Sequence, residues 1–202
     1  FIYNRYKELF QKHFILEKLF IEKIECFIDF SKKIRNKKFI FTDSDVIIIK
    51  NLDHVYNNNF NLCFTLNKKL NFNLNQCSVI NTGVIFFGKN AYKRNIFLEE
   101  WLKKSQSINE YLKEQSSLTR LLEKKINFKI NTINKIKIKN VPINIGFVER
   151  EIFNFTDIHK SLKLSNLINT KILHFKGLRH VKNEFSNLYK SLGLNSLLQK
   201  PR

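Results

Sequence analysis

The segment KFIFTDSDVIIIKNL, residues 38 to 52, decides which fold to expect. Two apolar runs, residues 38–42 and 46–49, flank a short acidic turn, and each run has the length of a buried strand. Asp43 and Asp45 therefore stand where the first strand ends. Open α/β sheets bind their ligands at the carboxyl ends of their strands, so the segment predicts both an α/β fold and the edge that carries its site.

The two carboxylates, separated by Ser44, are the candidate metal ligands of this edge. A plain turn of Asp and Ser between two strands is the alternative interpretation. Two acids at the boundary of a core repel each other unless a cation lies between them, however, and this favours a metal. Carboxylate oxygens are the ligands that Mg²⁺ and Mn²⁺ prefer, and these cations in turn bind a diphosphate.

The rest of the chain alternates between helical and strand patterns. Apolar residues recur every three or four positions in residues 14–30 and 91–104, which predicts two amphipathic helices. Ser107 and Glu110 fit a capping box that opens a third helix ending near Leu122. Further elements are expected as strands at 61–66, 84–88 (after the lead-in Asn81-Thr82-Gly83) and 171–175, one or two half-exposed strands within 126–139, and a short helix at 183–192. This interleaving predicts a mixed sheet covered by helices.

The composition fits one globular domain. The chain has 202 residues, of which 43% are apolar and 13% aromatic, with five Gly and two Pro. This excludes disordered and collagen-like chains and allows a sizeable core. No apolar run approaches the ~18 residues that a membrane span needs, and the N-terminus has no signal-peptide pattern. Three Cys without a CxxC spacing favour a reducing compartment over a disulfide framework or a structural zinc site.

The formal net charge of +19 has two interpretations. One is a basic surface for nucleic acid or an anionic membrane. The other is compositional drift, since Asn, Ile, Lys and Phe are all abundant and the Lys residues are dispersed along the chain. Drift is the favoured interpretation. Under either one, a positive field favours a phosphorylated ligand.

Four motifs, in order along the chain, resemble those of GT-A-type glycosyltransferases. They are the segment 38–52, the string NTGVIFF at 81–87, the pair Glu114-Gln115, and ILHFKG at 172–177. The first is similar to the D-x-D strand of that family, the second to its N-x-G strand, the third to its acidic-Gln motif and the fourth to its H-F-x-G motif. The combined pattern looks most like the retaining group typified by glycosyltransferase family eight.

This resemblance implies a GT-A-like nucleotide-diphospho-sugar transferase fold, an α/β architecture with a mixed central sheet flanked by helices. We expect a single catalytic domain over residues 1–202. In the family, the first strand and the base contacts lie farther ahead of the D-x-D motif than the 42 residues that precede Asp43 here. The chain is therefore expected to lack its N-terminal strand or strands.

The resemblance also implies roles for individual residues. Asp45 resembles the acid that ligates the divalent cation directly, Asp43 its companion, and His174 the third protein ligand, with Mn²⁺ or Mg²⁺ as the cation. Gln115 and Glu114 resemble the catalytic-site residues near the anomeric carbon. The remaining implied contacts to the nucleotide sugar come from Ser44, Asn81, Gly83, Lys176, Gly177 and Arg179. Several of these have plain alternatives, such as a core histidine for His174 or a solvated helix face for Glu114 and Gln115.

The expected function is a metal-dependent glycosyltransferase. It would move a sugar from a nucleotide diphosphate sugar, foremost a UDP-sugar, to a hydroxyl of an acceptor glycan, lipid or protein, with retention. We expect no nucleic-acid partner, and a cytoplasmic or membrane-peripheral location with contact through the basic surface.

Two other classes stay open on the sequence alone. A basic module that binds nucleic acid or anionic membrane would use the net charge, but its acidic pair would repel a polyanion. A nucleotidyltransferase of similar α/β architecture would also use paired acids and a divalent cation. That second class is expected to carry a phosphate-binding loop rich in Gly and Lys, and the sequence shows none.

Overall fold

The computed structural model describes residues 2–67, 72–73, 76–77, 79–110, 112–156 and 168–175, with backbone alone at 2–16, 72–73 and 76–77. Its centre is a five-stranded sheet in the order β1-β6-β3-β8-β7. The strands in that order are Phe39–Thr42, Ile80–Phe87, Leu62–Leu66, Val141–Glu149 and Thr132–Ile138. Only β3 and β8 pair in parallel, and the other neighbours pair antiparallel. The predicted mixed sheet is confirmed.

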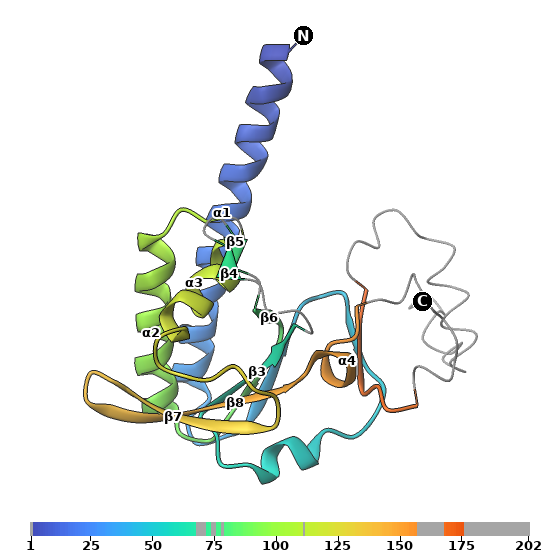
Figure 1. Ribbon diagram of the computed structural model, residues 1–202, viewed down its shortest axis with the longest axis vertical. Helices are drawn as coiled ribbons and strands as arrows, with labels where there is room; N and C mark the ends of the chain where they lie inside the picture. The colour runs from blue at the N-terminus through green and yellow to red at the C-terminus, as the bar shows by residue number, and fades with distance from the viewer. Residues whose placement is uncertain are drawn as a thin grey trace.

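Three helices cover one face of this sheet: α1 (Ile2–Lys33), α2 (Ala91–Ser107) and α3 (Lys113–Leu122). They stand side by side in Figure 1, where the N-terminal part of α1 projects beyond the other elements. Trp101 of α2 is fully buried among Phe27, Phe64 and their neighbours, as the helical period predicts. No helix of the described residues is long and apolar enough to cross a membrane.

The opposite face carries a second, smaller apolar cluster. It is covered by the 3-10 helix η1 (Asp53–Asn57), by α4 (Arg150–Phe153) and by the strand β9 (Ile172–His174). Alternation along β6 divides its side chains between the faces, with Ile85 and Phe87 in the large cluster and Val84 and Phe86 in the small one. The sheet is therefore flanked on both sides, as expected. The described residues also form two small strand pairs: β2 (Val46–Ile48) with β9, and β4 (Phe72–Asn73) with β5 (Gln76–Cys77).

The strand directions fix the edge at which ligands can bind. Since β1 and β3 both run antiparallel to β6, they share one direction, and β8 runs parallel to β3. The carboxyl ends of β1, β3 and β8 therefore lie along the same edge of the sheet. The start of β6 lies there too, because the Asp43 amide donates to the Gly83 carbonyl at 2.9 Å. We refer to this as the carboxyl edge.

Several local predictions were wrong. The strands β1 and β2 are not buried: β1 is half-buried because it borders the described sheet, and β2, which in the described residues pairs with β9 alone, leaves Ile48 exposed. Ser107 does not open a helix: it ends α2, and its hydroxyl donates to the Lys104 carbonyl. Glu110 pairs with Arg120 instead of capping. By contrast, the prediction of one or two half-exposed strands within residues 126–139 is confirmed, since they hold the strand β7 with alternating exposure. The helix expected at 183–192 lies outside the described residues.

A buried guanidinium joins α2 to the end of α1. Arg94 is fully buried, and it donates to the Ser31 hydroxyl at 3.1 Å and to the Ile34 and Lys37 carbonyls at 2.8 and 2.9 Å. It also donates to the Gly88 carbonyl. One side chain thus satisfies carbonyls where α1 ends and where β6 ends, which only a planar fork of donors can do.

We expect Arg94→Met to destabilise the protein by about 3 kcal/mol, because the Gly88 carbonyl stays buried and the Ile34 and Lys37 carbonyls part-buried without this donor. Urea unfolding followed by circular dichroism measures this change. Lys93→Met, one position away on the same helix and half-buried, is the matched control, with an expected change below about 0.5 kcal/mol. Equal effects of the two substitutions would show that Arg94 does not hold the junction.

Candidate active site

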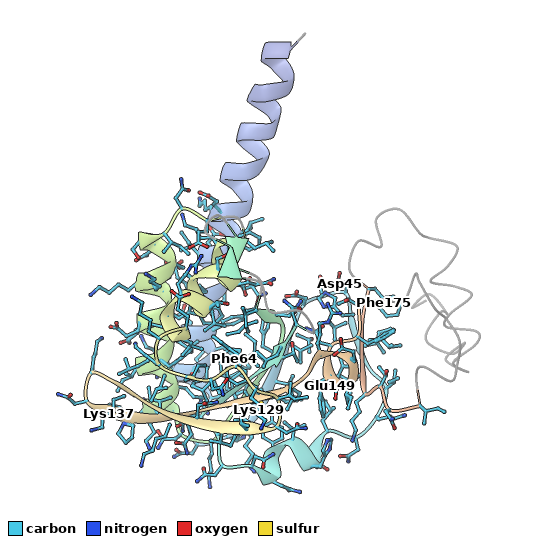
Figure 2. All side chains as sticks on the ribbon, in the orientation of Figure 1. Asp45, Phe64, Lys129, Lys137, Glu149 and Phe175 are labelled. Atoms are coloured by element: carbon cyan, nitrogen blue, oxygen red, sulfur yellow. The ribbon has the colours of Figure 1, made fainter. Side chains whose placement is uncertain are left out.

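Two aspartates and a histidine meet at the carboxyl edge. Asp43 follows β1, Asp45 precedes β2, and His174 is the last residue of β9. The pairing of β2 with β9 places Val46 opposite His174, and the Phe175 amide donates to the Asp45 carbonyl at 2.8 Å. Figure 2 shows Asp45 and Phe175 together at this point. The backbone of β9 thus brings in a side chain far away in the sequence.

The three side chains form a compact donor set, here called the Asp–Asp–His cluster (Asp43, Asp45, His174). The His174 Nε2 atom lies 3.2 Å from Asp45 Oδ1 and 3.8 Å from Asp43 Oδ2, and one ligand atom from each residue lies within 4.8 Å of the others. His174 is buried, whereas the two aspartates are about one-third exposed, at 34% and 36%. Two carboxylates and an imidazole, open on the carboxylate side, fit a divalent cation.

A lysine that the sequence analysis did not single out ties Asp43 to Glu114. The Lys23 ammonium, from α1, donates to Asp43 Oδ1 at 2.8 Å and lies 2.9 Å from Glu114 Oε1. It is also 3.4 Å from the Thr82 carbonyl oxygen. Because Lys23 holds Oδ1, Asp43 faces His174 with Oδ2. Glu114, at the start of α3, is buried and lies behind the lysine, away from solvent.

Burial and charge act in opposite directions on this pair. Burial alone would lower the pKa of Lys23, but the attraction of Glu114 and Asp43 outweighs it and raises that pKa above its usual value. Burial raises the pKa of Glu114, although Lys23 opposes the rise. The Lys23 ammonium contacts two carboxylates, those of Asp43 and Glu114, and Asp45 adds a third carboxylate beside His174. The excess of negative charge favours a bound cation at the exposed side.

We expect Lys23→Met to destabilise the protein by about 2–3 kcal/mol, because Glu114 then stays buried beside no cation. Urea unfolding measures the loss, and the double variant Lys23→Met, Glu114→Gln should recover most of it. Lys18→Met on the same helix removes an exposed pair with Glu22 and should cost less than about 1 kcal/mol. If the double variant were no more stable than Lys23→Met, the pair would not be the cause.

His174 is held from behind by a buried amide. Its Nδ1 atom lies 2.7 Å from Asn154 Oδ1, and Asn154 also contacts Asn81 and Thr65. Gly83 leaves the space that the ring occupies: a Cβ at this position would lie 2.5 Å from His174 Cε1. Of the residues predicted at the site, Gly83 lies against the His174 ring, and Asn81 is joined to His174 through Asn154.

The other residues expected at the site fall into two groups. Ser44 is exposed between the two aspartates, and Gln115 is half-buried on α3 beside Glu114. Within the described residues, the Gln115 amide makes no hydrogen bond to the Asp–Asp–His cluster. Lys176, Gly177 and Arg179 lie outside the described residues.

The residues that the sequence analysis missed are Lys23 and Asn154. Lys23 is one of several charges on an amphipathic helix, and nothing in its spacing separates it from the solvated face. Asn154 lies within the weakly patterned segment 150–170, in a chain rich in Asn. The packing of α1 and α4 against the carboxyl edge is what distinguishes Lys23 from the other charges of its helix and Asn154 from the other Asn residues.

Comparison with known proteins gives two findings. The family model of nucleotide-diphospho-sugar transferases matches residues 17–188, a range that contains the whole Asp–Asp–His cluster. Among solved structures, one described as the apo structure of the WbbM bifunctional glycosyltransferase is similar over 69% of this chain and 29% of that chain, with 12% sequence identity and a TM-score of 0.42. The chain therefore spans less than a third of that neighbour.

No curated protein is significantly similar to the chain. The family match by itself extends over more than three-quarters of the sequence and includes the strands β1, β3 and β8, which end at the carboxyl edge. The chain belongs to the nucleotide-diphospho-sugar transferase family, and the glycosyltransferase class predicted from its motifs is confirmed at that level.

Proposed function

We propose that this chain transfers a sugar from a nucleotide diphosphate sugar to an acceptor hydroxyl in a reaction that depends on a divalent cation. The observation that supports the proposal is the Asp–Asp–His cluster at the carboxyl edge of a chain of this family. The cluster's oxygen and nitrogen donors suit Mn²⁺, with Mg²⁺ as the alternative. Once bound, such a cation neutralises the charge that develops on the diphosphate leaving group.

Different residues at this edge position the cation and the nucleotide. Asp45 and His174 direct donor atoms to the same point, and Asp43 adds Oδ2 because Lys23 occupies its Oδ1. Ser44, exposed between the aspartates, places its backbone beside the nucleotide. Positioning of the cation and nucleotide thus rests on groups held by backbone pairing and by one buried ion pair, which limits their reorganisation during the reaction.

The donor sugar is proposed to lie over the start of β6 and α3. Asn81 has its Oδ1 committed to the protein, so its Nδ2 group is the one available to a sugar hydroxyl. Gln115 faces the anomeric carbon in this proposal, and Glu114 acts through Lys23, to which it is paired. Lys176, Gly177 and Arg179 are proposed to contact the diphosphate.

The proposed donor, stereochemical outcome, subgroup and acceptor rest on the resemblance of the motifs. We propose a UDP-sugar donor, retention of anomeric configuration and a place in the group typified by glycosyltransferase family eight. The acceptor is proposed to be a hydroxyl of a glycan, lipid or protein. Three further expectations stay predictions. They are a single catalytic domain over residues 1–202, a cytoplasmic or membrane-peripheral location of the protein, and contact of its basic surface with a membrane.

A donor-hydrolysis screen tests the proposal. UDP-glucose, UDP-galactose, UDP-xylose and their GDP counterparts are incubated with the purified protein and Mn²⁺, and released nucleotide is measured. We expect slow hydrolysis of one UDP-sugar that EDTA stops and excess Mn²⁺ restores. A parallel thermal-shift measurement should show stabilisation by UDP with Mn²⁺ together, more than by either alone. Equal hydrolysis in EDTA, or no stabilisation and no hydrolysis with any donor, would contradict the proposal.

A further inference from the structure

Asn154 lies at the centre of a buried hydrogen-bond network behind His174. It follows the last residue of α4 and has no exposed surface. Its Oδ1 lies 2.7 Å from His174 Nδ1, and its Nδ2 donates to Asn81 Oδ1 at 2.6 Å and to Thr65 Oγ1 at 3.1 Å. One side chain therefore joins β9, β6 and β3 at the carboxyl edge.

A backbone group fixes the direction of these bonds. The Gly83 peptide N–H, which can only donate, lies 2.8 Å from the amide atom of Asn81 that also faces Asn154. That Asn81 atom must therefore be the carbonyl oxygen, and the Asn154 atom facing it must be the donor, NH₂. The Thr65 hydroxyl donates to the backbone carbonyl oxygen of Asn81 at 3.1 Å, so the hydroxyl oxygen can accept from the NH₂ group of Asn154.

The orientation of Asn154 then determines which nitrogen of His174 carries a proton. With its NH₂ group committed to Asn81 and Thr65, Asn154 presents Oδ1 to His174 Nδ1. A carbonyl oxygen only accepts, so Nδ1 must carry the hydrogen. In the neutral imidazole, Nε2 then has its lone pair directed at Asp43 and Asp45, as a metal ligand requires.

We propose that Asn154 is a positioning residue that holds His174 as the Nδ1–H tautomer, with Nε2 presented to the cation. The inference rests on the proposed function in that it takes the Asp–Asp–His cluster to be a cation site. Histidines that bind metals generally need such a partner on the other ring nitrogen, and loss of that partner costs ~10- to 100-fold in metal affinity. The packing of the ring against Gly83 restricts its rotation in the same way.

The first test needs no substitution in the network. Long-range ¹H–¹⁵N correlation spectra of the metal-free protein, recorded at an alkaline pH where the imidazole is neutral, report which nitrogen is protonated. His174→Gln assigns the signals by their disappearance. We expect Nδ1 protonated and Nε2 unprotonated. A neutral His174 with its proton on Nε2 overturns the inference.

The second test separates the role of Asn154 from simple packing. Asn154→Ala removes the acceptor, and Mn²⁺ affinity measured by electron paramagnetic resonance should fall ~10- to 100-fold. Asn154→Asp keeps an acceptor for Nδ1–H but loses the donors to Asn81 and Thr65. Its melting temperature should fall, while its Mn²⁺ affinity stays within about threefold, since carboxylates serve as the same kind of partner. A purely structural role predicts that affinity follows stability in both variants, and that result overturns the inference.

Asn144→Ala is the matched control. Its amide, also next to β3, donates to the Asn59 carbonyl at 2.9 Å at the other end of β8, and Mn²⁺ affinity should not change. If the unmodified protein bound no Mn²⁺, the proposed function would fail, and the tautomer of His174 with and without Asn154 would still decide the inference. If the unmodified protein bound Mn²⁺ and the Asn154→Ala variant bound the cation equally well, the inference about Asn154 would fail and the proposed function would stand.

Discussion

Replacing Asp45 by asparagine should lower the affinity for Mn²⁺ at least ~100-fold, more than the loss of a partner residue behind a ligand costs. The substitution keeps the size of the side chain but removes its charge, and Asp45 Oδ1 lies 3.2 Å from His174 Nε2 within the Asp–Asp–His cluster. Asp45 is about one-third exposed, so the fold should tolerate the change. Binding of UDP in the presence of Mn²⁺, measured by titration calorimetry, should disappear together with Mn²⁺ binding.

Asp53→Asn is the control for this measurement. Asp53 is an exposed acid in η1 that accepts a hydrogen bond from Asn51. The Asp53→Asn substitution removes the same charge as Asp45→Asn. It should leave the affinities for Mn²⁺ and for UDP within about twofold of the values for the unmodified protein. Should Asp45→Asn bind Mn²⁺ as tightly as Asp53→Asn, Asp45 would not be a ligand, and the proposed cation site would be wrong.

An alanine at position 83 should have the second large effect. A Cβ there would lie 2.5 Å from His174 Cε1, 2.7 Å from His174 Nδ1 and 3.1 Å from Asn81 Oδ1. Since β9 holds the backbone of His174 against β2, the ring has to rotate and break its bond with Asn154. We expect a loss of about 2–4 kcal/mol in the free energy of unfolding from overpacking and broken hydrogen bonds. Mn²⁺ affinity should fall ~100-fold or more as the imidazole leaves the cluster.

Gly146→Ala is the matched substitution in the same sheet. A Cβ at Gly146 would lie 3.1 Å from Cys63 Sγ and 3.1 Å from Ile133 Cδ1, so two side chains must shift by only a few tenths of an ångström. Its expected cost is about 1 kcal/mol, with unchanged Mn²⁺ affinity. Urea unfolding and calorimetry measure both variants. Similar Mn²⁺ affinities for Gly83→Ala and Gly146→Ala would mean that His174 does not need the space beside Gly83.

Asp43 and Asp45 could be placed at the ligand-binding edge from the sequence, because they follow an apolar strand directly. His174 could be added to them only through the resemblance of ILHFKG to a family motif, since a single histidine at the end of a strand is otherwise read as a core residue. The large helices and β6 could be predicted for a different reason: their apolar residues follow one pattern without interruption.

Other features needed the folded chain. The strand β8 was missed because Pro142, Asn144 and Gly146 interrupt its apolar residues, and its stability comes from pairing with β3 and β7 on both sides. The capping box at Ser107 matched a local pattern that the longer α2 overrides. Lys23 reaches the site through the packing of a helix whose charges look alike in the sequence. Tertiary contacts decided each of these cases.

The most direct test of the account is a crystal structure with Mn²⁺ and UDP, recorded at a wavelength where manganese scatters anomalously. We expect one strong anomalous peak enclosed by Asp43, Asp45 and His174, with the diphosphate of UDP next to it. UDP bound at the carboxyl edge without a manganese peak between these three side chains, or manganese bound elsewhere with UDP, would show that these three residues do not form the cation site.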